Sequence, residues 1–221
     1  MPAKVLYFDL GNVLLSFSHE RMYRQMAAAA GVSPEELVQA LFGEGGAARA
    51  LVDYETGRLT TDEFFDVVQR AMNKRPDREQ FTTAVCDIFA PIDATWELVQ
   101  QLAAAAARHD GWPRLAILSN TNPIHWAWVT DGRFPLLASI GRPASLFAWS
   151  ILSYEAGAMK PDRAIYDAAI ERAGVAAAEI FFVDDMPENV AGARAAGIDA
   201  VLFEGTAKLV ADLRARGVAG V

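Results

Sequence analysis

The feature that most constrains the fold of this chain is a series of short apolar runs, each followed at once by a polar residue. Three of these runs end at Asp9, at Ser119-Asn120 and at Asp184-Asp185. Apolar runs of this length, separated by helical stretches, are typical of buried parallel strands. In an open parallel sheet, ligands bind beyond the carboxyl ends of the strands. We therefore predict an α/β protein in which these polar residues gather at one edge of a single sheet.

A long helical stretch separates the first apolar run from the others. From about residue 19 to 108 we expect helices and no strand, with capping boxes at 33–36 and 60–63. After residue 113 the strand and helix patterns alternate. This order predicts a Rossmann-like parallel-sheet core formed by residues 1–15 and 91–221, with a helical cap, residues 16–90, inserted after the first strand. The expected core elements are strands at 4–9, 115–118, 146–152, 180–183 and 200–203, and helices at 93–108, 161–173, 187–196 and 207–216.

The composition limits the functional classes. A chain of 221 residues that is 52% hydrophobic is long enough for one α/β domain and a smaller insert. The net charge of -8 and the lack of a basic run argue against nucleic acid or an anionic membrane as a partner. Cys86 is the only cysteine, which excludes an intrachain disulfide and fits a reducing compartment. We expect a cytoplasmic protein that acts on a small molecule.

The residues at the strand ends suit metal-assisted phosphoryl transfer. The Asp9 carboxylate can attack phosphorus, and carboxylate oxygens are ligands that Mg²⁺ prefers. Asp184 and Asp185 are adjacent, and two neighbouring carboxylates repel each other unless a cation or several donors join them. Lys160, which precedes Pro161, would add positive charge for an anionic substrate. Taken alone, Asp9, Ser119-Asn120 and Lys160 are each about as typical of a turn, a helix cap or a solvated loop, whereas the adjacent Asp184 and Asp185 are less so. The prediction therefore depends on the position of all of them at strand ends.

The segments that carry these residues resemble the motifs of the haloacid dehalogenase-like (HAD) hydrolase superfamily. The four segments, which occur in the family's order, are 8–14 (FDLGNVL), 118–122 (LSNTN), 157–162 (GAMKPD) and 183–190 (VDDMPENV). A helical insert after the first motif is similar to the helical-cap class of this family. Segments 55–60 and 160–166 add a resemblance to glucose-1-phosphate phosphatases and to the phosphatase domain of soluble epoxide hydrolases.

The resemblance implies a reaction and a role for each site residue. Asp9 would form an aspartyl-phosphate intermediate, and Lys160 would pair with Asp9 and with the phosphoryl oxygens. Ser119 and the backbone amide of Asn120 would bind a phosphoryl oxygen during transfer. The implied Mg²⁺ ligands are Asp9, the Gly11 carbonyl, Asp184 and, directly or through water, Asp185. The substrate would be a small phosphorylated metabolite, with sugar phosphates as one class.

Gly11 departs from the family pattern, because phosphatases of the family usually carry a second Asp at this position. That Asp protonates the leaving group, and such acid–base help is worth about 10²- to 10⁴-fold in rate. Three interpretations stay open: a phosphatase in which water or a cap residue substitutes, a metal-independent 2-haloacid dehalogenase, or a phosphate-ester-binding protein with little turnover. The acidic pair and Lys160 favour the first. The substitution Gly11→Asp is then expected to raise turnover of esters with poor leaving groups, unless the position requires glycine for a steric reason.

Substrate choice is expected to lie in the cap. Residues 16–21 and 54–59 are expected to face the leaving group. His19 and Glu20 lie where the chain enters the cap and are candidates for substrate contact. His125 directly precedes Trp126 and lies three residues before Trp128, a context more typical of packing than of catalysis. We also expect a loop at 43–46 and a helix-end position for His109.

Overall fold

Five parallel strands form the central sheet of the protein. The computed structural model describes residues 3–43, 47–106, 108, 113–142 and 145–218. Within them the strand order is β5-β4-β1-β6-β7. The strands are β1 (Val5–Phe8), β4 (Arg114–Ser119), β5 (Trp149–Leu152), β6 (Ile180–Asp184) and β7 (Asp199–Leu202). Strand β1 is central, with Val5 opposite both Arg114 and Ile180. The expected Rossmann-like parallel sheet is confirmed.

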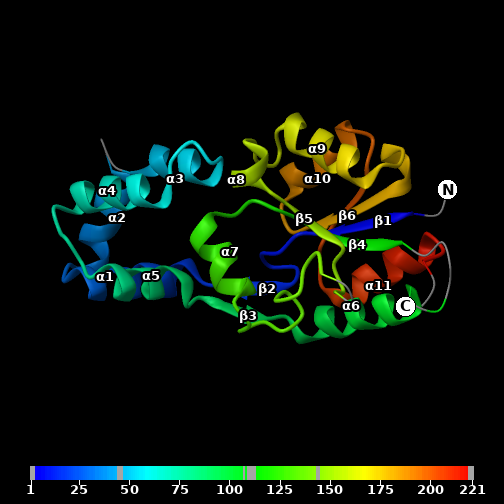
Figure 1. Ribbon diagram of the computed structural model, residues 1–221, viewed down its shortest axis with the longest axis horizontal. Coiled ribbons are helices and arrows are strands. Elements are labelled where there is room, and N and C mark those ends of the chain that lie inside the picture. Colours follow the sequence, from blue (N-terminus) through cyan, green and yellow to red (C-terminus); the bar gives the residue numbers. More distant parts are fainter. Residues whose placement is uncertain (1–2, 44–46, 107, 109–112, 143–144, 219–221) are drawn as a thin grey trace.

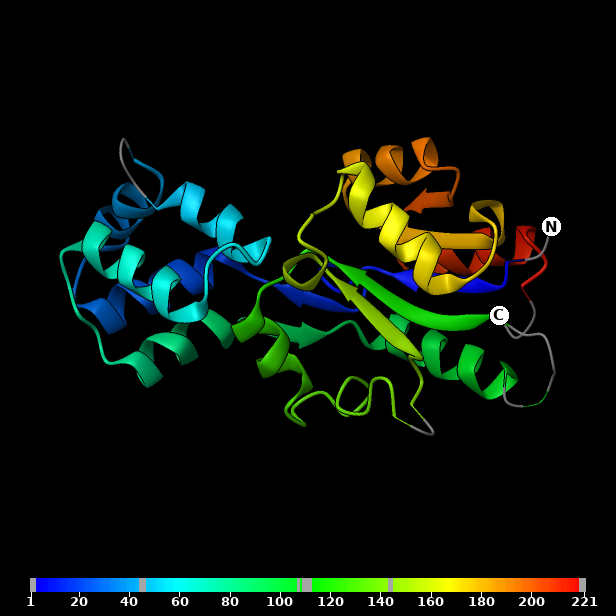
Figure 2. The ribbon, with the colours of Figure 1, turned by 45° about the horizontal axis from the view of Figure 1, so that its top comes forward.

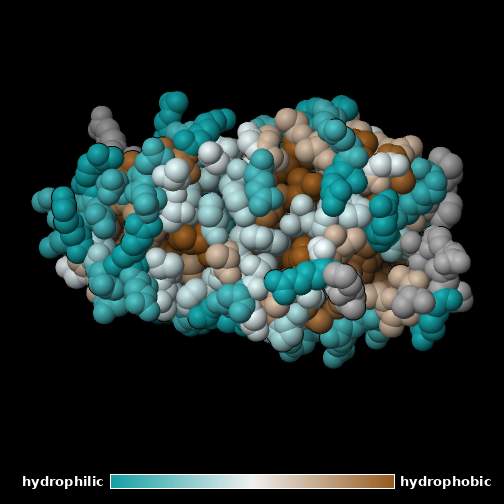
Figure 3. All heavy atoms as spheres, in the orientation of Figure 1, coloured by the Kyte–Doolittle hydropathy of each residue, from teal (hydrophilic) through white to brown (hydrophobic). Residues whose placement is uncertain are grey.

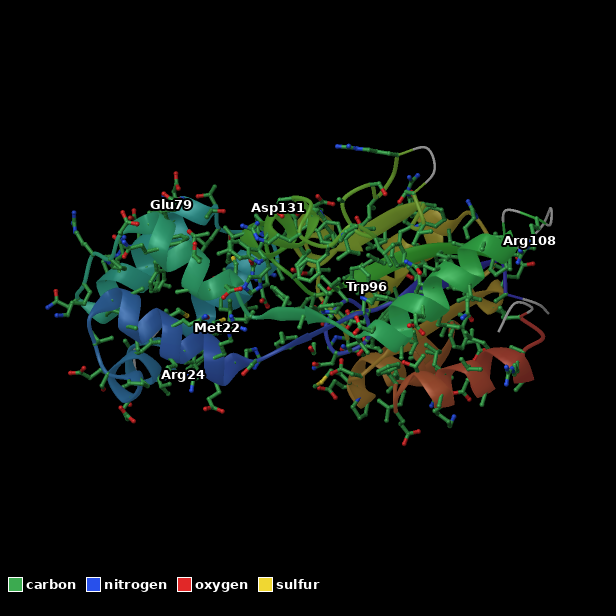
Figure 4. All side chains as sticks on the ribbon, turned by 90° about the horizontal axis from the view of Figure 1, so that it is seen from below. Met22, Arg24, Glu79, Trp96, Arg108 and Asp131 are labelled. Atoms are coloured by element: carbon green, nitrogen blue, oxygen red, sulfur yellow. The ribbon has the colours of Figure 1, made fainter. Side chains whose placement is uncertain are left out.

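Helices cover both faces of this sheet (Figure 1). Helices α9 (Arg163–Ala173) and α10 (Pro187–Ala195) lie on one face, and α6 (Asp93–Ala106) and α11 (Thr206–Ala215) lie on the other. Figure 4 shows Trp96 on α6, seen from below the sheet. Side chains of β1 alternate between two apolar cores: Leu6 and Phe8 pack in one, and Val5 and Tyr7 in the other. Because every residue of β1 is buried, the strand reads as a continuous apolar run in the sequence.

A helical insert lies beyond the carboxyl ends of the core strands (Figure 2). Its helices are α1 (His19–Ala30), α2 (Pro34–Phe42), α3 (Ala48–Glu55), α4 (Thr61–Met72) and α5 (Arg78–Cys86). They share an apolar core of their own, which includes Met26, Leu37, Phe65 and Phe81. Both expected capping boxes are present, at the start of α2 and of α4. The insert therefore has a packing core separate from those of the sheet.

Two short strands that the sequence did not reveal join the insert to the core. Strand β2 (Leu15–Phe17) pairs antiparallel with β3 (Phe89–Pro91), and Phe17 lies opposite Phe89. The expectation of helices alone from residue 19 to 108 was wrong at β3, since three residues are too few to show a strand period. The expected cap limits, residues 16 and 90, both fall inside this strand pair.

Other boundaries also differ from expectation. Strand β5 begins only at Trp149, and α9 begins at Arg163 because Asp162 is its extended N-cap. Helices α3, α7 (Pro123–Thr130) and α8 (Ser153–Ala156) were not predicted. Gly43 ends α2, whereas residues 44–46 and His109 lie outside the described residues. In the described part of the chain no helix is long and apolar enough to cross a membrane.

Candidate active site

The polar residues that follow the apolar runs meet at the carboxyl edge of the sheet. Asp9 directly follows β1, Ser119 ends β4 and Asp184 ends β6. Lys160 lies in the loop between α8 and α9. All four are buried, with Asp9 only 7% exposed and Lys160 3% exposed. The structure thus brings together side chains that are up to 175 residues apart, from Asp9 to Asp184, as the sheet topology predicted.

The ammonium group of Lys160 lies between two carboxylates. Its Nζ is 2.8 Å from Asp9 Oδ1 and 2.6 Å from Asp184 Oδ2, and it donates to the Leu118 carbonyl oxygen at 3.0 Å. Three acceptors match the three protons of an ammonium group. Burial lowers the pKa of Lys160, but the charges of Asp9 and Asp184 outweigh burial, so the net shift is upward. Lys160 therefore stays charged in this buried place.

Asn120 positions Lys160 through backbone contacts. Its side-chain Nδ2 donates to the Lys160 carbonyl oxygen at 2.9 Å, and its Oδ1 accepts from the Lys160 amide at 2.8 Å. Ser119 Oγ is buried and donates to the Asn120 carbonyl at 3.3 Å. The Asn120 side chain thus fixes the lysine loop beside the end of β4.

Three carboxylates form an acidic cluster beside this lysine. Asp9, Asp184 and Asp185 each offer an oxygen atom within 4.8 Å of the others. When all three carboxyl groups are ionised, one ammonium leaves two net negative charges, which a divalent cation would neutralise. A donor set made only of oxygen atoms suits Mg²⁺ and not a thiolate-binding metal. The residues present therefore fit the metal that the sequence predicted.

Two asparagines that the sequence analysis did not single out hold the acidic cluster in place. Asn189 Nδ2 and the Met186 amide each donate to Asp184 Oδ1 at 2.9 Å. Asn12 Nδ2 donates to Asp185 Oδ2 at 2.9 Å, from a backbone with φ 53°. Asn12 lies in segment 8–14 and Asn189 in segment 183–190, two of the segments that resemble the family motifs. Their position in these segments was the sequence signal that could have identified them. Such second contacts orient metal-binding carboxylates.

The ionisation of Asp9 depends on nearby positive charge. Burial raises the pKa of its carboxyl to about 7, and Asp184 adds to the rise, whereas Lys160 and the Leu10 amide oppose it. A carboxyl with this pKa is only partly ionised near neutral pH in the absence of a metal. A cation in the acidic cluster would favour the carboxylate, the form that acts as a nucleophile.

A phenyl ring occupies the space beside Gly11. A Cβ atom at Gly11 would lie 2.8 Å from Phe17 Cε1, closer than carbon atoms approach in proteins. The Phe17 ring is itself packed edge-on against His19, with centroids 5.0 Å apart, and against Phe89, at 6.2 Å. This is the steric reason for glycine that the sequence analysis left open, since a side chain at residue 11 would require the ring to move.

A cavity of about 190 Å³ extends from the catalytic edge into the helical insert. Gly11, Ser119 and Asn120 line one part of it, and side chains of the insert line the rest. Glu55, in the last turn of α3, is the carboxyl group in its wall. Burial raises the pKa of Glu55, and a hydrogen bond with Asn122 opposes the rise.

His125 joins the core to the insert across this cavity. Its Nδ1 is 3.2 Å from Asn122 Nδ2, and its Nε2 is 3.3 Å from the Val85 carbonyl oxygen in α5. Burial lowers the pKa of His125 to about 4. The neutral ring accepts from Asn122 and donates to Val85, so it acts as a packing contact, as its tryptophan neighbours indicated.

A comparison with known proteins identifies the family of this chain. A family model described as haloacid dehalogenase-like hydrolase matches residues 3–197. The chain belongs to the HAD-like hydrolase family. It is 26% identical to a D-ribitol-5-phosphate phosphatase of Bacteroides thetaiotaomicron over 85% of each chain. It is 24% identical to a flavin mononucleotide hydrolase of Arabidopsis thaliana over 97% of this chain and 78% of the other.

A solved HAD enzyme has the same architecture. The enzyme from Bacteroides thetaiotaomicron, in complex with magnesium and inorganic phosphate, superposes with a TM-score of 0.73 and 28% identity over 90% of this chain and 93% of its own. The family resemblance drawn from the four motifs is therefore confirmed, and the HAD-like chain is a hydrolase.

Proposed function

We propose that this HAD-like hydrolase is a Mg²⁺-dependent phosphatase of small phosphorylated metabolites. The observation that carries the proposal is the buried Lys160 ammonium between Asp9 and Asp184, with Asp185 completing an acidic cluster. The names of the two relatives and the magnesium and phosphate complex of the solved enzyme support it. A cytoplasmic location and the lack of a nucleic-acid or membrane partner stay predictions from composition.

Asp9 is the proposed nucleophile. Its carboxylate oxygen forms a bond to phosphorus as the bond from phosphorus to the ester oxygen breaks, which gives an aspartyl phosphate. Water then attacks this intermediate, releases inorganic phosphate and restores Asp9. Lys160 holds Asp9 in place through the 2.8 Å contact and offers positive charge to the phosphoryl oxygens. Ser119 and the Asn120 amide are the proposed oxygen-binding groups at the end of β4.

The acidic cluster is the proposed Mg²⁺ site. Asp9, Asp184, Asp185 and the Gly11 carbonyl would hold the ion, with Asn12 and Asn189 orienting two of the carboxylates. Bound Mg²⁺ would offset the charge of the phosphoryl group and of the acidic cluster. Removal of the metal with EDTA should therefore abolish turnover, and Mg²⁺ should restore it.

Glu55 is the proposed proton donor to the leaving group. Gly11 has no side chain, and Phe17 occupies the neighbouring space, so the usual second Asp is absent. Glu55 lines the same cavity as Gly11 and Ser119. It belongs to the helical insert, for which we propose the limits 16 and 90. Burial favours its protonated form, which is the form a general acid requires.

Two panels of substrates and one variant test the proposal. Phosphate release from phosphomonoesters and halide release from 2-haloacids are measured with Mg²⁺ and with EDTA. We expect phosphate release that requires Mg²⁺ and that is abolished in Asp9→Asn, which preserves side-chain volume. Halide release that persists in EDTA would establish the dehalogenase instead, and binding of phosphate esters with no product would establish a binding protein.

A further inference from the structure

The cavity beside the catalytic edge has mostly aromatic and aliphatic walls. Ten aromatic side chains are among the residues that line it, and most of them are phenylalanines and tyrosines: Phe17, Tyr23, Phe42, Tyr54, Phe64, Phe65, Phe81 and Phe89, with His19 and His125. Met22 and Met26 of α1 add flexible apolar surface, and Figure 4 shows Met22 on the inner side of α1 and Arg24 on its outer side. By contrast, the outer face of the insert is largely hydrophilic (Figure 3). The insert therefore directs apolar side chains toward the place where the leaving group would lie.

Several rings in this wall already pack against one another. His19 and Tyr23 are stacked, with centroids 6.0 Å apart and planes 11° apart. Tyr54 and Phe64 are stacked at 4.5 Å and 9°. Stacked and edge-on rings present flat surfaces, and another ring gains dispersion and quadrupole contacts against such surfaces.

Two polar groups of the wall, the Tyr54 hydroxyl and the His125 ring, are engaged within the protein. Tyr54 Oη is 3.0 Å from Thr61 Oγ1, and both ring nitrogens of His125 have partners in Asn122 and the Val85 carbonyl. A ligand hydroxyl placed here would have to displace such a bond or stay unpaired. A polar group buried without a partner loses its bonds to water, and a cavity of this kind therefore discriminates against a polyol chain.

The volume of the cavity limits the size of the organic group that a bound phosphate ester can carry. Its volume of about 190 Å³ slightly exceeds the roughly 150 Å³ of an apolar protein cavity that binds benzene. One ring with a short linker to the phosphate fits this volume, and Gly11 and Ser119 in the lining put one part of the cavity beside the edge of the sheet that carries Asp9.

We propose that the substrate is a phosphomonoester whose organic group is apolar and contains an aromatic ring, and not a phosphorylated polyol. The proposal rests on the proposed phosphatase function and names the substrate class of that same site. The aromatic ring would lie among the insert side chains, while Asp9 and Lys160 face the phosphate. Selectivity then comes from the insert and not from the acidic cluster, as the sequence predicted.

Two esters of primary alcohols test this proposal with matched chemistry at phosphorus. The value of kcat/KM is measured for 2-phenylethyl phosphate and for ribitol 5-phosphate at saturating Mg²⁺. We expect the aromatic ester to be favoured by at least about 10-fold, the low end for one apolar group in a hydrophobic pocket. An equal or higher value for ribitol 5-phosphate would overturn the substrate class and leave the phosphatase function intact.

A pair of substitutions on α3 tests whether the cavity is the site of selection. Ala48 is exposed and lines the cavity, whereas Val52, one turn later and 45% exposed, does not. Ala48→Trp should raise KM for 2-phenylethyl phosphate about 10-fold or more, and Val52→Trp should leave it within about 2-fold. Equal KM values in the two variants would overturn the placement of the aromatic group in this cavity.

A binding measurement separates failure of the substrate class from failure of the function. The probe is 3-phenylpropylphosphonate, in which a methylene replaces the ester oxygen, and its binding is measured by calorimetry against the phosphonate analogue of ribitol 5-phosphate. Preferred binding of the aromatic phosphonate without turnover of any ester would overturn the phosphatase and support the aromatic cavity. No preference in binding and no turnover would overturn both.

Discussion

Removal of the Lys160 ammonium should destabilise the metal-free protein strongly. In the structure Nζ contacts Asp9 at 2.8 Å and Asp184 at 2.6 Å, and the Lys160 side chain is 1% exposed. The substitution Lys160→Met replaces the side chain by an unbranched apolar one that is one heavy atom shorter, and it removes the charge. It leaves two buried carboxylates without their shared counter-charge, an arrangement that costs about 3–5 kcal/mol of unfolding free energy.

The predicted change is large enough for a melting experiment. For a chain of this size about 1 kcal/mol corresponds to about 2–4 °C in Tm, so Lys160→Met should lower Tm by about 6–20 °C. The measurement is made in EDTA at pH 8, above the pKa of about 7 to which burial raises Asp9, so that most of the Asp9 carboxyl is ionised. Saturating Mg²⁺ should reduce the difference in Tm between wild type and Lys160→Met, because a bound cation replaces part of the lost positive charge.

Lys208→Met is the matched control. Lys208 contacts Asp212 at 2.7 Å, but its side chain is 50% exposed. An exposed pair on a helix contributes only about 0.3–0.5 kcal/mol, which corresponds to about 2 °C or less. The reasoning is refuted if Lys160→Met lowers Tm in EDTA no more than Lys208→Met does, or if Mg²⁺ leaves the difference between wild type and Lys160→Met unchanged.

Three further predictions concern the cavity and Gly11, which lies two residues after the proposed nucleophile, Asp9. Glu55→Gln should lower kcat for alkyl phosphates more than for p-nitrophenyl phosphate, whose leaving group needs little protonation; an equal loss on both would exclude Glu55 as the acid. Gly11→Asp should lower turnover of both kinds of ester because of the Phe17 ring, and adding Phe17→Ala should recover part of the loss; a gain in the single variant would show that the ring moves aside. Burial lowers the pKa of His125 to about 4, below the ordinary value of about 6.5, so its neutral form contributes stability that is present above pH 6.5 and is lost as the pH falls toward 4. The free energy of unfolding, measured with urea, should therefore fall more between pH 7 and pH 5 in wild type than in His125→Gln. Over the full window from pH 6.5 to 4 the extra fall amounts to at most about 3 kcal/mol, and equal falls in the two proteins would contradict the lowered pKa of His125.

The sequence predicted the sheet, and the gathering of polar residues at one edge of it, because the signals there are strong. The strand ending at Asp9 is buried on both faces, so its apolar run is unbroken. A parallel sheet then leaves one place for the polar residues that follow each strand. The resemblance to family motifs added the order of the core and the insert. It also drew attention to Lys160, whose role is a proposal and which lies in a loop without a strand or helix period.

Contacts that depend on tertiary packing could not be predicted. Strands β2 and β3 are three residues each and stabilise one another by pairing, so neither shows a period of its own. The Phe17 ring explains Gly11, but nothing in the spacing of the two residues indicates a 2.8 Å approach. The lowered pKa of His125 could not be predicted either, because it is caused by burial between α7 and α5 and not by the neighbours of His125 in the sequence.

The strand pair that carries the chain into and out of the insert has a consequence for how such enzymes diversify. Phe17 and Phe89 are opposite partners, so the insert occupies the position of a turn at the tip of a hairpin. Hairpin tips are places where a chain accepts added segments, because both ends stay fixed by the ladder of hydrogen bonds. Helices can therefore lengthen, shorten or change their side chains there while Asp9, Lys160 and Asp184 keep their positions. With substrate selection in the insert, as we propose, a change of specificity can be inherited without a change in the residues proposed for the reaction.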